Sequence, residues 1–252
     1  MFTTVKNKIE IENMRESGRI LSHVLNNLST RVSEGMTTKD IAEIAKKELK
    51  PTGGLPTCLG YNGFPDVICI SVNDEVVHGI PRGNRKINNG DIVSLDLGVT
   101  FNGMITDSAI SLIVGSPKDK KHVELVENTK KSLMKGISVV TDGVTVGDIS
   151  YSIQRVLDHY GYGIVRDLVG HGVGYEFHEE PDIPNYGKRN TGPRLYAGMT
   201  IAIEPMATLG GYDITEDDDG WTIRTSDGSM AAHFEHTVLI TDDGCEILTK
   251  NT

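Results

Sequence analysis

The 252-residue sequence predicts an α+β fold made of two equivalent halves, and three observations lead to this prediction. A stretch that begins at Glu34 reappears 108 residues later at Asp142. A second stretch, beginning at Gly90, reappears at Gly198 with the same shift. In each half, segments with helical periodicity precede short β-rich segments separated by glycine and asparagine turns. Two separate matches at one offset indicate an internal repeat.

Four helices are expected, two in each half. Apolar residues at helical spacing predict the first over residues 8–29, and a second begins at Thr37-Thr38 and stops at Pro51. The second half repeats the pattern with a helix near 119–138 and another from Thr145 to Gly161. In both halves a threonine with an aspartate three residues later has the spacing of a capping box, which favours a helix start.

A β-hairpin is expected in the first half. The apolar stretches 91–99 and 104–114 read as strands, and Asn102-Gly103 between them is the strongest short hairpin signal. With these two residues as the turn, Phe101 pairs with Met104. A bulge in either strand would change the pairing.

Each strand of this hairpin carries an aspartate among apolar residues. In the same register Gly98 pairs with Asp107, so Asp96 lies on the same face as Asp107, at a diagonal Cα separation of about 7–8 Å. Two buried carboxylates would repel each other, and a divalent cation is the most direct compensation. The alternative is that one aspartate caps a turn and the other faces solvent.

The repeat adds two acids from the second half. Asp96 maps onto Glu204, which we expect inside the apolar strand 200–206, and Glu235 precedes an apolar strand as Asp107 does. Four acids would then face one another, and two divalent cations would balance their charge. Paired ions about 3.5–4 Å apart are a known hydrolytic arrangement.

The histidines divide into candidate site residues and others. His171 lies among glycines in Gly170-His171-Gly172-Val173-Gly174, which leaves its imidazole accessible, while His78 and His178 begin short motifs that end in proline. His233 shares strand parity with Glu235 and is expected near the acids, whereas His236 should face away. The remaining histidines lie in helical stretches and read as surface or packing residues: His23, His122 and His159.

Composition excludes several classes of protein. The 25 lysines and arginines against 35 aspartates and glutamates give a net charge of −10, which disfavours a nucleic-acid clamp. No apolar run reaches membrane length, no secretory signal is expected, and three cysteines suit a reducing cytosol. We also find no zincin motif, because Asp182 stands where its second histidine would be, and no phosphate or dinucleotide loop. We expect a cytoplasmic protein with one domain, 1–252, and halves of about 1–117 and 118–252.

Several motifs in order resemble the pita-bread metallopeptidases over almost the whole chain. These are the glycine-rich motif around His171, the run His178-Glu179-Glu180-Pro181, and the ordered set Asp96, Asp107, His171, Glu204 and Glu235. Four further motifs resemble the bacterial type I methionine aminopeptidases: Cys58–Tyr61, His78–Pro81, Ala202–Pro205 and Glu235–Thr237. The resemblance implies a pita-bread fold, with two pseudo-symmetric α-α-β-β halves that share a curved antiparallel sheet and carry helices on its outer face.

The resemblance also implies a dinuclear metal centre. Asp96 would chelate one divalent ion, His171 and Glu204 would bind the other, and Asp107 and Glu235 would bridge both. A hydroxide held between the ions would attack the first peptide bond. Co, Mn, Fe and Zn all suit such ligands, so the ion stays open. A monovalent cation held by backbone oxygens near Asn73 is a further feature of the family.

Roles for other residues follow from the same resemblance. Glu204 would pass a proton from the nucleophile to the leaving amine, His178 would stabilise the oxyanion, and His78 would contact the substrate backbone. An apolar and sulfur-rich lining would receive an unbranched thioether. Its residues would be Cys58, Tyr61, Phe64, Cys69, Phe177 and Trp221; the alternative for Phe64 and Cys69 is a plain core role.

The implied activity is removal of the initiator methionine from nascent proteins whose second residue is small. The expected partners are nascent N-termini and, transiently, the ribosome, with no nucleic-acid substrate, no membrane and a monomeric state. The sequence departs from the family at Asn62-Gly63-Phe64, where many members have a histidine and a second tyrosine, which affects contacts beyond the first substrate residue. The acidic run 216–219 reads as a solvated hairpin tip.

Three other kinds of protein share part of this pattern. Proline-specific relatives share all five ligands but usually carry a large extra N-terminal domain. A catalytically inactive binding module would typically have lost ligands, which are all present here. A non-enzymatic Ca²⁺ site would not need the imidazole of His171.

Overall fold

The computed structural model describes residues 1–250. Within this part of the chain, four α-helices run over α1 (Lys8–Arg31), α2 (Thr38–Leu49), α3 (Lys120–Ile137) and α4 (Val146–Tyr160). A short 3₁₀ helix, η1, covers Tyr61–Gly63. No helix among these residues is both long enough and apolar enough to cross a bilayer.

The strands of the first half precede α3 and those of the second half follow α4. The first set is β1 (Leu55–Pro56), β2 (Cys69–Val72), β3 (Glu75–Val77), β4 (Ile92–Phe101) and β5 (Met104–Ile113). The second set begins with β6 (Gly163–Ile164), β7 (Gly170–Gly172), β8 (Glu179–Ile183), β9 (Thr200–Ile203) and β10 (Met206–Thr208). It ends with β11 (Ile214–Glu216), β12 (Ile223–Thr225), β13 (Ala231–His233), β14 (His236–Thr241) and β15 (Gly244–Ile247).

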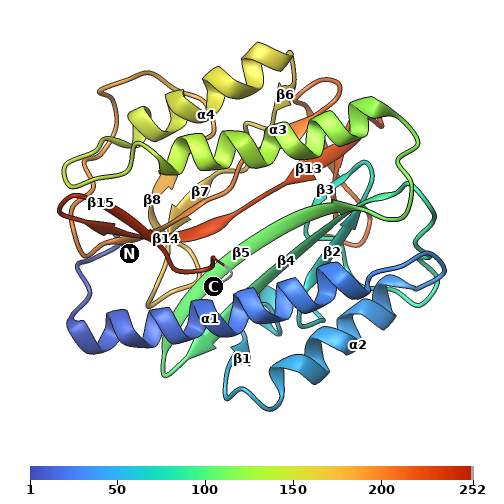
Figure 1. The fold of residues 1–252 in the computed structure, drawn as a ribbon, viewed down its shortest axis with the longest axis horizontal. Coiled ribbons are helices and arrows are strands. Elements are labelled where there is room, and N and C mark those ends of the chain that lie inside the picture. Colours follow the sequence, from blue (N-terminus) through green and yellow to red (C-terminus); the bar gives the residue numbers. More distant parts are fainter. Residues whose placement is uncertain (251–252) are drawn as a thin grey trace.

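The helices form two pairs with the strands between and behind them (Figure 1). All strand pairs are antiparallel and form four hydrogen-bonded sets: β1-β4-β2 with β5 on β4, β13-β10-β6, β11-β12-β3, and β15-β14-β9-β7-β8. One apolar core packs α1 and α2 against β2 and β4, and another packs α3 and α4 against β9, β13 and β14. The predicted α+β class is confirmed.

The 108-residue repeat is confirmed in the hydrogen bonds. Thr37 and Thr145 both start helices with complete capping boxes, and each forms an isolated bridge, with Lys86 and Arg194 respectively. Gly35 N donates to Ile87 O at 2.9 Å, and the bond one repeat later, from Gly143 N to Leu195 O, is 2.8 Å long. The start of the second helix and the segment that leads into the following strand therefore have the same structure in both halves.

The predicted hairpin register is also confirmed. Phe101 is the partner of Met104 across the β4–β5 ladder, and Gly98 is the partner of Asp107. Asp96, opposite Ala109, therefore projects from the same face as Asp107.

The two halves meet where β5 approaches residues 233–237. Thr237 Oγ1 accepts from Asp107 N and donates to Asp107 O, both at 2.8 Å. Ser108 Oγ donates to Glu235 O at 2.6 Å, and Glu235 N donates to Ala109 O at 2.9 Å. Hydroxyl groups thus replace part of a backbone ladder at the seam, and they hold Asp107 and Glu235 next to each other.

The prediction of a continuous strand over 200–206 is wrong. β9 ends at Ile203 and β10 begins at Met206, and the two strands belong to different sheets. Pro205 has no N–H for a ladder, so the chain leaves one sheet at Glu204 and enters the next. Glu204 therefore lies at a break between strands. The alternation of side chains between the two faces of a sheet does not fix the direction of its side chain there.

Candidate active site

Three of the predicted ligands form a compact group at the seam. One ligand atom from each of Asp107 on β5, His171 on β7 and Glu235 between β13 and β14 lies within 4.8 Å of the other two. All three residues are buried, at 5% exposure or less. Distances of this order allow one cation to contact all three side chains.

Asp96 and Glu204 complete the predicted set around the same cavity, which they line together with the first three. Glu204 directs one carboxylate oxygen to within 3.4 Å of His171 Nε2 and the other to within 3.7 Å of His233 Nε2. Asp96 projects from β4 beside Asp107. The expectation that His233 lies near the acids and His236 faces away is confirmed, since His236 Nδ1 lies 2.8 Å from Thr249 Oγ1.

The four acids perturb one another strongly. Burial raises the pKa of Asp96 to about 7. Burial and then the charge of Asp96 raise the pKa of Asp107, and burial with the neighbouring carboxylates raises those of Glu204 and Glu235. Four adjacent anions, of which Asp107 and Glu235 are buried and Asp96 and Glu204 are partly buried, cannot all be ionised without compensating positive charge.

The donor set fits divalent cations. Glu235 Oε1 is buried and finds no hydrogen-bond partner among residues 1–250, which suits an oxygen reserved for a metal. His171 Nδ1 lies 2.9 Å from Gly172 O, a contact that needs the ring hydrogen on Nδ1 and leaves the lone pair of Nε2 toward Glu204. Burial and then His178 lower the pKa of His171 to about 3, so its ring is a neutral ligand. Carboxylates with one imidazole suit Mn²⁺, Fe²⁺, Co²⁺ or Zn²⁺.

The cavity with the acids, of about 60 Å³, brings together almost every residue predicted for the site. Its lining consists of Cys58, Phe64, Cys69, Val77, His78, Asp96, Asp107, His171, Phe177, His178, Glu204, Trp221, His233 and Glu235. Tyr61 is absent from this lining but lies directly beside it, since its hydroxyl is 2.8 Å from His178 Nδ1. Val77 was not predicted, because an apolar residue within a short strand gives no signal of its own.

The predicted apolar residues form one cluster against the acids. Phe64 meets Trp221 edge-on with ring centroids 5.2 Å apart, and Tyr61 meets Phe177 edge-on at 5.1 Å. Cys58 and Cys69 are free thiols in the same cluster. Gly98 leaves room for the ring of Phe177, because a Cβ at position 98 would lie only 2.6 Å from Phe177 Cζ.

A larger cavity of about 350 Å³ adjoins the first. The two share Val77, His78, His171, His178 and Glu204 as lining residues. The larger one continues past Glu180 and Asp182 on β8. The imidazoles of His78 and His178 therefore lie where this inner chamber meets the outer, more open one.

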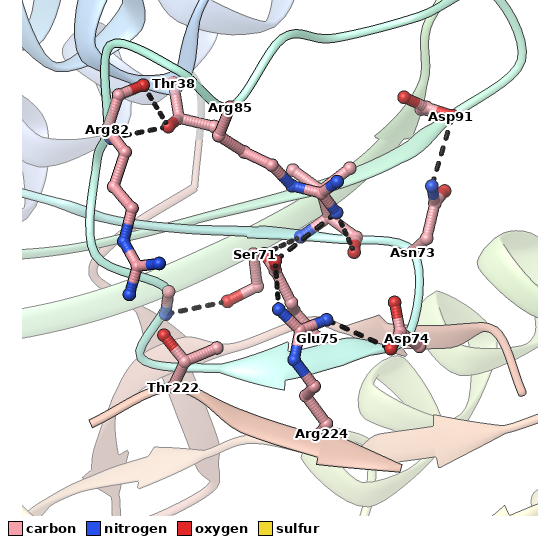
Figure 2. A network of polar contacts seen from close by, with 12 residues as sticks. Thr38, Ser71, Asn73, Asp74, Glu75, Arg82, Arg85, Asp91, Thr222 and Arg224 are labelled. Carbon is pink, nitrogen blue, oxygen red and sulfur yellow. Dashed lines mark hydrogen bonds and ion pairs between the residues drawn. The ribbon is translucent and has the colours of Figure 1, made fainter. Parts of the chain in front are cut away.

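His78 follows β3 with a positive φ of 59°, a conformation unusual for a residue other than glycine. A polar network next to it fixes this part of the chain (Figure 2). Gly79 N donates to Ser71 Oγ at 3.1 Å, while Glu75 pairs with Arg224 at 2.9 Å and with Arg85 at 3.3 Å. Through Glu75 and Arg224 the network ties β3, the strand that precedes His78, to β12. Sequence reasoning did not find it, because its members come from separate segments.

The acidic run 216–219 lies at the tip of the β11–β12 hairpin, as expected, with Glu216 and Asp218 exposed. Its other two acids form ion pairs. Asp217 pairs with Arg224 at 2.8 Å, and Asp219 pairs with Arg82. Asp219 also accepts from the backbone N–H groups of Trp221 and Thr222 at 2.9 and 2.8 Å. The run therefore shapes the turn that carries Trp221 to the cavity.

The chain is similar to known proteins over almost its whole length. The model of metallopeptidase family M24 matches residues 12–242. The chain is 44% identical to a methionine aminopeptidase of Clostridium acetobutylicum, with 97% of this chain and 98% of the relative covered. It is 45% identical to methionine aminopeptidase 1 of Bacillus subtilis, with 96% of each covered. The crystal structure of a methionine aminopeptidase from Thermotoga maritima superposes with a TM-score of 0.97 at 42% identity, covering 99% of this chain and 100% of the other. The chain belongs to metallopeptidase family M24.

Proposed function

We propose that this protein is a metal-dependent aminopeptidase that removes N-terminal methionine from chains whose second residue is small. The observation that carries the proposal is the cluster of buried acids with one imidazole, which lies in a chamber that is also lined by aromatic rings and thiols. Such a chamber suits a thioether side chain, which is polarizable and favours aromatic edges. We further propose that halves of about 1–117 and 118–252 form one catalytic domain, since the seam between them carries Asp107 and Glu235.

We infer that five residues hold two divalent cations. Asp96 would contact one, His171 and Glu204 the other, and Asp107 and Glu235 both. Bound divalent cations would lower the pKa of water and polarise the scissile carbonyl. The choice among Co, Mn, Fe and Zn, and a monovalent cation near Asn73, belong to the same proposal.

Glu204 is the candidate for proton transfer. Its side chain is 13% exposed, it sits at the strand break, and it faces both chambers. A carboxylate in this position can accept the proton of the attacking water and deliver it to the leaving amine. Because Glu204 lies between two strands and not within one, its carboxylate would be able to reach both the attacking water and the leaving amine.

His178 is the candidate donor for the oxyanion. Burial lowers the pKa of its ring, so the ring is neutral near pH 7. When the Tyr61 hydroxyl donates to Nδ1, the ring hydrogen is on Nε2, which can donate to the oxygen of the tetrahedral species. His78, which also lies where the two chambers meet, would contact the substrate backbone near the leaving nitrogen.

The passage between His78 and His178 is the candidate size filter. The methionine side chain would occupy the inner chamber, so the second side chain would lie between these two rings. The rest of the substrate would follow the larger cavity. We propose nascent polypeptides as substrates, in the cytoplasm and in transient contact with the ribosome, with the enzyme acting as a monomer.

Turnover of two tripeptides by metal-loaded protein tests the proposal. We expect Met-Ala-Ser to be cleaved and Met-Lys-Ser to be cleaved far more slowly. Equal rates would refute the size filter, and no turnover of either would refute the activity. Cleavage of Ala-Pro peptides instead would indicate a proline-specific enzyme. Metal analysis of the purified protein, with anomalous scattering from crystals, would count and identify the ions.

A further inference from the structure

A buried ion pair links the N-terminal segment to the turn that carries His178. Lys6 Nζ lies 3.4 Å from Glu179 Oε2, and neither side chain is exposed to solvent. The partners are 173 residues apart in sequence. Lys6 also donates to Thr3 Oγ1 at 3.0 Å, and its ammonium lies 4.8 Å from the centre of the Tyr175 ring. A fully buried ammonium is uncommon, and the hydrogen-bond partners of this one are Thr3 in its own segment and Glu179 in the turn 174–179.

Glu179, the partner of Lys6, also forms hydrogen bonds with the backbone of the turn. Its second oxygen, Oε1, accepts from the backbone N–H groups of Tyr175 at 2.7 Å and of Glu176 at 3.1 Å. Gly174 N closes the turn by donating to Glu176 O at 3.2 Å. The carboxylate thus holds the start of the turn, while Phe177 and His178 at its end line the inner cavity.

The glycine-rich motif makes room for this arrangement. A Cβ at Gly174 would lie 2.6 Å from Lys6 Cε, and a Cβ at Gly172 would lie 2.8 Å from Thr3 Cβ. Backbone bonds fix the segment as well, from Thr3 N to Glu180 O at 2.6 Å and from Lys6 N to Gly198 O at 2.9 Å. Gly172 and Gly174 in the motif around His171 are therefore required by packing against the N-terminal segment.

We propose that Lys6 is a positioning residue for His178. Its ammonium neutralises and orients Glu179, and Glu179 fixes the backbone of residues 175–176, so that His178 faces the scissile bond. A buried carboxylate without Lys6 would be an uncompensated charge, and it would be expected to draw in water or rotate away from the turn. The part played by His178 in catalysis rests on the proposed function, whereas the placement of His178 by Lys6 does not.

Lys6→Met tests the proposal, because methionine keeps the length of the side chain and removes the charge. We expect kcat for Met-Ala-Ser to fall about tenfold to a hundredfold with a smaller change in KM, because a displaced donor weakens the transition state more than the bound substrate. Lys8→Met is the matched control, since Lys8 is exposed at the start of α1 and its variant should keep the wild-type rate.

A readout that does not depend on activity separates positioning from stability. In Zn²⁺-loaded and in metal-free protein with labelled histidine, the ring NMR signals of His178 should shift in Lys6→Met and stay in place in Lys8→Met. A folded Lys6→Met variant with unchanged His178 signals and unchanged kcat would overturn the proposal. So would a fall in rate that follows only a lower Tm. If wild-type protein does not cleave Met-Ala-Ser, the proposed function fails, yet the NMR comparison still decides this inference.

Two double variants cover the case in which Lys6→Met does not fold. Lys6→Met with Glu179→Gln leaves no buried charge and keeps an oxygen for the two backbone donors. Lys6→Met with Glu179→Leu also leaves no buried charge but removes that acceptor. We expect wild-type-like His178 signals in the first and displaced signals in the second. Identical signals in both would show that the turn does not depend on this carboxylate, against the proposal.

Discussion

The hydroxyl of Tyr61 lies 2.8 Å from Nδ1 of His178, although the two residues are 117 positions apart. Tyr61 begins the short helix η1, and its ring also packs edge-on against Phe177. When the hydroxyl donates in this contact, Nδ1 is the acceptor and the ring hydrogen of His178 lies on Nε2. The other nitrogen is the one available to substrate.

Tyr61→Phe should therefore slow catalysis without removing the metal site. Loss of one hydrogen bond that sets a tautomer corresponds to about 1 kcal/mol, or about a fivefold lower kcat. Steady-state kinetics on Met-Ala-Ser would measure it. Tyr196→Phe, at an exposed tyrosine, is the control and should behave as wild type. An unchanged kcat in Tyr61→Phe would rule out this role of the hydroxyl.

Glu204→Gln should remove most of the activity. The substitution keeps the shape of the side chain and takes away its ability to carry a proton, which is expected to lower kcat by about a hundredfold or more. Metal content should be measured on the same samples, since Glu204 is also a proposed ligand. Glu216→Gln, at an exposed acid of β11, is the control. A Glu204→Gln enzyme with its metal and its full rate would contradict the assignment.

Metal binding should depend on pH in a defined direction. Burial raises the pKa of Asp96 from its ordinary 3.8 to about 7, so metal-free folded protein holds more protons than the unfolded chain across this window. Its free energy of unfolding should then fall as pH rises through the window. Cations that replace those protons remove this penalty, so the gain in Tm on adding metal should grow from about pH 5 to about pH 8.

Calorimetry offers an independent check of that coupling. Titration of Mn²⁺ in two buffers with different ionisation enthalpies gives the number of protons released. We expect release at pH 6 and less at pH 8, where Asp96 is already ionised. Metal binding with no proton release at either pH would mean that the acids are ionised before the metal arrives.

Gly98→Ala should impair the methionine pocket. The new Cβ would lie 2.6 Å from Phe177 Cζ and 3.1 Å from Thr57 Cβ, so Phe177 must move. Overpacking of this kind costs about 1–3 kcal/mol, and the displaced ring should raise KM for methionine peptides more than it lowers kcat. Gly83→Ala is the matched control, because nothing lies within 4 Å of the added atom and its φ is not positive. Equal KM values in both variants would show that the pocket tolerates the displacement.

The sequence alone determined the elements whose signals are local. The helices and their caps follow from apolar periodicity and from threonine–aspartate spacing, and the hairpin register follows from Asn102-Gly103. That register was enough to place Asp96 and Asp107 on one face. The repeat then pointed to Glu204, and the resemblance to a family supplied the remaining roles.

Only the tertiary structure decided how these groups meet. The hydroxyl seam between Asp107 and Thr237 and the burial of Lys6 against Glu179 both join segments far apart in the chain. No periodicity or local propensity encodes such contacts, because each depends on the packing of elements that are complete only after folding. The sequence thus determines which side chains are charged. The packing determines which of those charged groups are desolvated and which lie close enough to interact.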